Sequence, residues 1–127
     1  MIKNFLIINC TGKNNIIALR VNNNFFLKKL QTNIRNNETL VNKIFVFARE
    51  KKANVDKNFS VIVNIGPGSF SGIRISLAVA KGIKITKGSK LYGYKNHDLA
   101  EFNAKNIEIL IKNKLIENNL IKPVYIS

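Results

Sequence analysis

The 127-residue sequence has no tryptophan, one cysteine, one methionine and one histidine. A single cysteine excludes an internal disulfide bond and a zinc site built from cysteines. A single histidine leaves the usual zinc centre of metalloproteases without its ligands. No apolar run approaches the roughly 20 residues of a membrane span, and residues 1–8 lack the pattern of a secretory signal. We therefore expect a cytoplasmic protein.

Acidic residues are also few, seven against 21 lysines and arginines, which gives a net charge of +14. Such a balance is typical of proteins that bind nucleic acid or anionic membranes. However, 17 of the basic residues are lysines, and they accompany 20 asparagines and 19 isoleucines. These three residues share AT-rich codons, so the base composition of a genome can produce the profile without selection for binding. We favour a solvated basic surface and keep a basic tRNA-binding module as an alternative.

None of the seven acidic residues ends a predicted core strand, where a metal-binding or general-base carboxylate is expected in an α/β fold. The one histidine, His97, stands beside Asp98 at the start of a short predicted helix. A catalytic interpretation would need Ser69 or Ser71 as nucleophile and His97 as base. The spacing neither supports nor excludes that arrangement, and a surface histidine is the simpler interpretation. We predict no catalytic residue and no metal ligand.

The first 37 residues predict a meander of three antiparallel strands joined by tight turns. The strands are expected over 5–9, 16–21 and 25–30, with turns at 10–13 and 22–24. A polar loop is expected over 31–37. The predicted order of the whole chain is β-β-β-α-β-α-β-α-α, an α/β layered domain with a mixed sheet.

The segment 38–52 predicts a helix, because apolar residues recur at helical spacing. They form one stripe of Leu40, Val41, Ile44, Phe45 and Ala48. Val46 and Phe47 lie off that stripe, so the helix is either nearly enclosed or presents a second face to a partner. A loop at 54–58 and a buried, parallel strand at 59–65 follow.

A second helix is predicted from Ser71, as its N-cap, to residue 85, with Gly88 ending it. Its apolar stripe consists of Ile73, Leu77, Ala80 and Ile83. Ala78 and Gly82 are small and four residues apart, which permits close approach of another helix. Beyond it we expect a short strand at 91–94, a short helix at 97–103 capped by Asn96, a helix over 105–119 and an extended tail at 123–126.

Three glycines and a proline crowd the turn between the 59–65 strand and the second helix, Gly66-Pro67-Gly68-Ser69-Phe70-Ser71-Gly72-Ile73-Arg74. Glycine and proline at this density are costly unless a special backbone path is needed. The turn brings backbone N–H groups to a helix N-terminus, where an anion or a close neighbour can sit. It matches neither a Walker A loop nor the dinucleotide fingerprint. The turn alone is therefore a weak signal, whereas the whole string is specific.

A second turn, Cys10-Thr11-Gly12, follows the first strand. In nucleotide-binding domains that open with a β-hairpin, such a turn cradles phosphates and an aspartate at the strand end handles the metal. Here Asn9 takes the aspartate's place, and its lack of charge removes the main attraction for Mg²⁺. We interpret residues 9–12 as a vestigial nucleotide turn and Cys10 as a small core residue.

The glycine string and its continuation, Ile75-Ser76-Leu77-Ala78-Val79-Ala80-Lys81-Gly82, resemble the motif of the TsaB family, also known as YeaZ. Ser71 replaces a threonine of the family motif and Ser76 a glycine, both mild changes. The opening hairpin, the helix near Glu38, the segment 96–100 and the ending 123–126 stand in the family's order. Asn9 and Cys10 depart from its Asp-Thr, and Asn37 replaces a small residue.

The resemblance implies an actin/hsp70-like (ribonuclease H-like) first lobe over residues 1–104. It implies a C-terminal helix and tail over 105–127 that pack on this lobe as one compact domain. The stretch from Ala100 to Pro123 is far too short for the family's second lobe, so most of that lobe is expected to be deleted.

By the same resemblance, the chain is a non-catalytic scaffold that binds and activates a TsaD-like enzyme in tRNA threonylcarbamoyladenosine (t6A) synthesis. ATP and metal are expected on that partner and no cofactor on this chain. A TsaE-like ATPase could join a larger complex, tRNA contact would be indirect, and no membrane is involved. The family's glycoprotease (M22) label does not imply an activity here. The alternatives are a small nucleotide-binding or phosphotransfer protein and the tRNA-binding module.

The two helices with surplus apolar or small residues are the expected partner interface, as half of an intermolecular four-helix bundle. Alone, the chain is expected to form homodimers through the same helices. The expected interface residues are Leu40, Val41, Ile44, Phe45, Phe47, Ile73, Leu77, Ala78, Val79 and Gly82.

Overall fold

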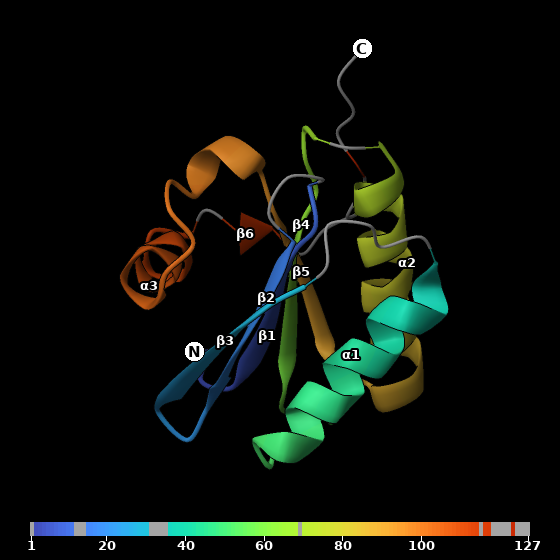
Figure 1. Ribbon diagram of the computed structural model, residues 1–127. Helices are drawn as coiled ribbons and strands as arrows, with labels where there is room; N and C mark the ends of the chain where they lie inside the picture. Colours follow the sequence, from blue (N-terminus) through green and yellow to red (C-terminus); the bar gives the residue numbers. More distant parts are fainter. Residues whose placement is uncertain are drawn as a thin grey trace.

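A six-stranded mixed sheet runs through the middle of the computed structural model, which describes residues 2–11, 15–30, 36–68, 70–114, 116–117 and 123. The strands lie in the order β3-β2-β1-β4-β5-β6 (Figure 1). Strands β1, β4 and β5 are parallel to one another, whereas β2, β3 and β6 pair antiparallel with their neighbours. Their bounds are β1 (Phe5–Asn9), β2 (Ile16–Val21), β3 (Asn24–Lys29), β4 (Ser60–Asn64), β5 (Lys90–Tyr94) and β6 (Ile116–Glu117).

The three-strand meander predicted from the sequence is confirmed, and the bounds of β1 and β2 are those expected. The β2–β3 turn consists of Asn22 and Asn23, whose φ angles are 51° and 69°. Asparagine tolerates this left-handed region better than other residues with a side chain. Two such residues in succession match the twist of a two-residue hairpin, so the asparagine pair fixes the register of β2 on β3.

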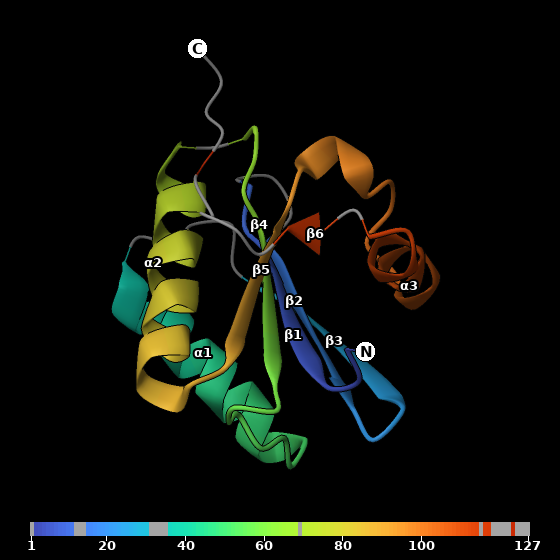
Figure 2. The same ribbon diagram turned by 180° about the vertical axis from the view of Figure 1, so that it is seen from behind.

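Helices cover both faces of the sheet (Figures 1 and 2). Helices α1 (Asn37–Glu50) and α2 (Phe70–Lys87) lie side by side on one face, and α3 (Ala104–Lys112) lies on the other. Because successive strand residues point to opposite faces, Leu6 and Ile8 join the core beneath α1 and α2, whereas Phe5 and Ile7 join the one beneath α3. No helix within the described ranges is long and apolar enough to cross a membrane.

Helix α1 begins one residue before the predicted start, because Asn36 is its N-cap. The side-chain oxygen of Asn36 accepts a hydrogen bond from the Thr39 backbone N–H at 2.8 Å. The apolar face is wider than the predicted stripe. Phe47, which lies off that stripe, is buried with Leu40, Ile44 and Ala48, so of the two alternatives for this side of the helix the enclosed one holds at Phe47. Val46 does face solvent.

Helix α2 begins at Phe70, so Ser71 lies inside its first turn and the predicted N-cap role was wrong. The helix runs two residues past the predicted residue 85, and Gly88 ends it as predicted. Gly88 follows Lys87 with a φ of +72°, and its N–H donates to the Lys84 carbonyl at 3.0 Å. This left-handed residue caps the last turn, a conformation that glycine adopts at little cost.

The C-terminal third differs most from the prediction. The expected helix over 97–103 is only a short 3₁₀ helix, η1 (Asn96–Asp98), and Asn96 lies within it rather than capping it. The helix expected over 105–119 is α3, which is capped by Asn103 and ends at Lys112. Lys114, with a φ of +57°, then turns the chain into β6, a strand that was not predicted.

The expected tail at 124–126 and residues 31–35 of the expected loop lie outside the described residues. Helix α3 packs on the sheet through Ile107 and Leu110, and an ion pair joins Glu108 to Arg20 of β2. The division into a lobe of 1–104 and a segment of 105–127 stays a prediction.

The hydroxyl of Tyr94, at the end of β5, gives a test of the packing in its buried surroundings. It is fully buried near Asn64 and Cys10, and it makes no hydrogen bond of regular geometry with the described residues. A buried hydroxyl without a partner costs about 1–3 kcal/mol. We therefore expect Tyr94→Phe to leave the free energy of unfolding unchanged or to raise it by about 1 kcal/mol, as measured by urea denaturation. A loss of more than about 1 kcal/mol would show that the hydroxyl has a partner.

Candidate functional site

The glycine turn packs against the turn that follows β1. A Cβ atom on Gly68 would lie 2.9 Å from Thr11 Cβ, closer than real Cβ contacts allow, so only glycine fits there. Gly66 has a φ of +100° and follows a buried strand. Its peptide bond to Pro67 is cis. Two of the three glycines therefore have a structural role: they let the loop approach Thr11 and enter α2.

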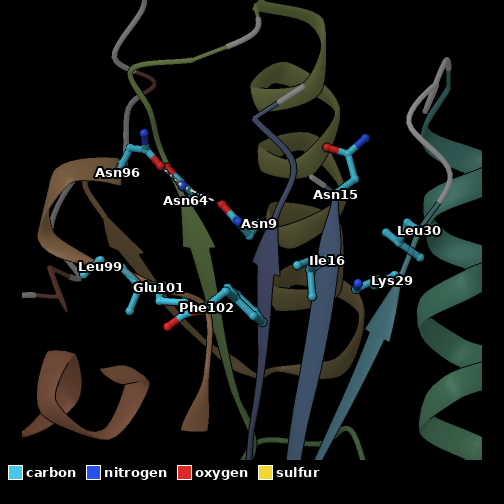
Figure 3. A pocket seen from close by; sticks show the side chains of 11 residues that line it. Asn9, Asn15, Ile16, Lys29, Leu30, Asn64, Asn96, Leu99, Glu101 and Phe102 are labelled. Carbon is cyan, nitrogen blue, oxygen red and sulfur yellow. Dashed lines mark hydrogen bonds between the residues drawn. The ribbon is translucent and has the colours of Figure 1, made fainter. Parts of the chain in front are cut away.

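Three asparagines meet at the carboxyl edge of the parallel strands (Figure 3). Asn9 ends β1, Asn64 ends β4, and Asn96 follows β5. The Asn64 side-chain nitrogen donates to the Asn9 oxygen at 2.7 Å and to the Asn96 oxygen at 3.0 Å. The Asn64 oxygen accepts from the Gly66 N–H at 2.8 Å. Asn64 is only 1% exposed, and both the nitrogen and the oxygen of its side-chain amide are hydrogen-bonded. We call Asn9, Asn64 and Asn96 the asparagine clamp.

A cavity of about 440 Å³ opens beside this clamp, between the sheet and the segment that leads to α3 (Figure 3). Ligands of open α/β sheets commonly bind at this edge. The lining holds one carboxylate, Glu101, and one cation, Lys29, and its other polar side chains are amides. The lining residues are Asn9, Asn15, Ile16, Lys29, Leu30, Asn64, Asn96, Leu99, Ala100, Glu101 and Phe102.

Carboxylate oxygens are the main attraction for Mg²⁺ in proteins, and amides replace them at this edge. Within the described ranges, no three His, Cys, Asp or Glu side chains are grouped as a metal site requires. The interpretation of residues 9–12 as a vestigial nucleotide turn stays a prediction, and Gly12 lies outside the described residues. Glu101 was not foreseen, because no motif or periodicity marks its position.

The residues of the rejected catalytic arrangement are placed as follows. His97 is exposed, and its ring nitrogen lies 3.6 Å from the Asp98 carboxylate. Ser71 is exposed on α2, and Ser69 lies outside the described residues. Cys10 is buried in the core, as predicted, and this burial raises the pKa of its thiol to about 12.

The expected partner interface divides into two groups. Six of its ten residues lie in the chain's own core and are not available to a partner: Leu40, Ile44, Phe47, Ile73, Leu77 and Val79. The expectation was wrong for these six side chains, because both helices turn their wide apolar faces to the sheet and to each other. The remaining four, Val41, Phe45, Ala78 and Gly82, are at least partly exposed.

Two exposed apolar residues extend this smaller surface. Ile85 is 81% exposed and follows Ala78 and Gly82 at helical spacing on α2. Val46 is 46% exposed on α1. A Cβ atom on Gly82 would meet nothing within 4 Å, so the helix surface is open there. The spacing of Ala78, Gly82 and Ile85 could have revealed this face from the sequence. We call Ala78, Gly82 and Ile85 the α2 outer face.

Comparison with solved structures establishes the class of fold. No family profile matches the chain. YeaZ from Pseudomonas aeruginosa superposes with a TM-score of 0.66 at 17% identity, covering 78% of this chain and 46% of YeaZ. A second crystal structure, of an uncharacterized protein with similarity to peptidase YeaZ from Pseudomonas aeruginosa, gives the same score and identity and is 45% covered. The fold expected for the first lobe is thus confirmed as that of YeaZ.

A relative found by sequence gives a more specific resemblance than the fold does. The tRNA threonylcarbamoyladenosine biosynthesis protein TsaB of Buchnera aphidicola subsp. Baizongia pistaciae (strain Bp) is 45% identical over 58 residues. That match covers 44% of this chain and 26% of the relative. The resemblance to TsaB is confirmed, and the chain spans less than half the length of the proteins that it matches.

The buried thiol gives a chemical prediction. With a pKa of about 12, Cys10 carries a thiolate in roughly one molecule in ten thousand at pH 8. We expect negligible reaction with a disulfide reagent such as DTNB at pH 8 in the native protein. Unfolding brings the pKa back towards 9.0 and exposes the sulfur, so labelling should then be complete. Rapid labelling of the native chain would contradict the placement of Cys10.

The asparagine clamp gives a stability prediction. Asn64→Ala leaves the buried Gly66 N–H without its acceptor and frees the oxygens of Asn9 and Asn96. We expect a loss of about 2–3 kcal/mol in the free energy of unfolding, measured by urea denaturation. Asn106→Ala is the control, because its side-chain amide donates an exposed hydrogen bond to the backbone carbonyl of Glu101. It should cost about 1 kcal/mol or less.

Proposed function

We propose that this chain is a non-catalytic subunit that docks onto a TsaD-like enzyme and supports its activity in t6A modification of tRNA. The carrying observation is the α2 outer face, an exposed apolar and small-residue surface beside α1, in a chain that resembles TsaB. The relative's name places that protein in threonylcarbamoyladenosine biosynthesis. Contiguous exposed apolar patches often mark interaction surfaces, and Ile85 is the large apolar side chain of this one.

The geometry of the helix pair supports docking through a bundle. Helices α1 and α2 contact each other along one face of the sheet, and Phe45 of α1 lies under the ammonium group of Lys87 of α2 at 5.7 Å. A pair fixed in this way can supply two helices to a four-helix bundle with a partner. The small residues Ala78 and Gly82 let a partner helix come close to the α2 backbone.

The cavity beside the asparagine clamp supports the part of this proposal that assigns the chemistry to the partner enzyme. With amides at the strand ends and a single lining carboxylate, the chain is poorly suited to hold Mg²⁺ and a nucleotide. ATP, metal and the threonylcarbamoyl group would therefore belong to the TsaD-like enzyme. A TsaE-like ATPase could join the complex, and contact with tRNA would be made through the enzyme.

Ala78→Arg tests the docking face. The arginine would place a charge in an apolar interface. We expect association with the TsaD-like protein of the same genome to weaken by about tenfold or more, which is about 1.4 kcal/mol. The measurements are co-purification after co-expression and the t6A content of the tRNA.

Ile109→Arg is the matched control, since Ile109 is 43% exposed on α3, on the opposite side of the sheet. It should leave both measurements unchanged. Ile44→Asp is unsuitable as a test, because Ile44 is buried and its replacement would unfold the chain. Equal association of Ala78→Arg and the wild type would refute the docking face.

A further inference from the structure

Helix α2, which presents the outer face, carries charge of one sign only. Helix α2 contains Arg74, Lys81, Lys84 and Lys87 and no acidic residue, and all four cations are exposed. Ile85 lies among them. Helix α1 is different, because Glu38 and Glu50 balance its two cations. The positive charge of the helix pair is therefore concentrated on α2, around the apolar and small residues proposed for docking.

Lys81 and Lys84 are not neutralised within the described part of the chain. Neither has a carboxylate within ion-pair distance there, where the ion pairs found are Arg20–Glu108 and His97–Asp98. Lys87 has a structural role, since its ammonium group lies over the Phe45 ring. Lys81 and Lys84 are thus the cations that a docked partner would meet and that can be changed without disturbing the seam between α1 and α2.

We propose that the α2 outer face selects a partner protein whose docking surface is acidic around an apolar centre, and that it disfavours a second copy of this chain. This inference rests on the proposed docking function. Two copies joined through α2 would bring eight cations of two helices together without an acidic residue of α2 between them. Like charges across an interface lower affinity, and complementary ones raise the association rate. The charge therefore argues against the expected homodimer.

An RNA occupant fits this face less well than an acidic protein. The centre of the face is the exposed Ile85 beside the open surface at Gly82, and neither offers anything to a phosphate backbone. RNA recognition commonly uses exposed aromatic side chains on which bases stack. Helix α2 has no aromatic residue between Ser71 and Lys87. Apolar contact surrounded by charge is the usual composition of a protein–protein interface.

The test compares two double variants with the same change of charge. Lys81→Glu/Lys84→Glu reverses the charge on α2, and Lys105→Glu/Lys112→Glu makes the same change on α3. Affinity for the TsaD-like protein is measured by calorimetry at about 50 mM and about 300 mM salt. We expect the α2 variant to bind about tenfold or more weakly at low salt, with a smaller difference at high salt, and the α3 variant to bind like the wild type.

Three further results decide the inference. Wild-type affinity of the α2 double variant at low salt, together with a loss on Ala78→Arg, would keep the docking site and overturn its charge selectivity. If neither variant weakened binding, the proposed function itself would fail. A tRNA transcript that binds the wild type and not the α2 variant, while the TsaD-like protein binds both equally, would show an RNA surface and overturn the inference.

Self-association is measured on the same proteins by analytical ultracentrifugation. At low salt we expect the wild type to stay monomeric at micromolar concentration, because the four cations of each α2 repel those of the other. A wild-type dimer at low salt that Ala78→Arg dissociates would show self-association through α2 and overturn the proposal.

Discussion

The hydrogen bonds of Asn64 hold together the three segments that meet at the carboxyl edge of the sheet. Its amide joins the end of β1 at Asn9, the second residue after β5 at Asn96, and the start of the glycine turn at Gly66. From there the turn runs against Thr11, in a space that admits no side chain at Gly68, and enters α2. The orientation of α2, and with it the outer face, therefore depends on this buried amide.

The two sides of the sheet differ in the charge of the surface that they present. On the α3 side, the cavity at the strand ends is lined mostly by amides and apolar groups, a neutral surface at the place where this class of sheet commonly binds ligands. On the other side, α2 presents cations around Ile85. The chain thus combines a cleft that has few charged groups with an exposed, positively charged helix surface. The proposed docking role uses the helix surface and asks for no chemistry in the cleft.

Burial decides which helix residues can take part in binding. Most of the apolar residues of α1 and α2 stabilise the chain itself, since they fill the core between the helices and strands β1 and β4. The surface left over is small and depends on Ala78, Gly82 and Ile85. A small apolar centre contributes limited affinity, so the surrounding lysines matter more for the choice of partner than they would around a large one.

Sequence alone was enough to predict the meander, the parallel strand between two helices and the resemblance carried by the glycine turn, because these depend on local periodicity and turn residues. It could not separate core from surface on α1: periodicity placed Phe45 on the predicted stripe and Phe47 off it, whereas packing buries Phe47 and leaves Phe45 partly exposed. It also missed β6 and the asparagine clamp. Both features bring together residues that are far apart in the chain: β6 pairs with β5, and Asn9, Asn64 and Asn96 meet. Local sequence patterns do not encode such contacts, which form when the chain packs.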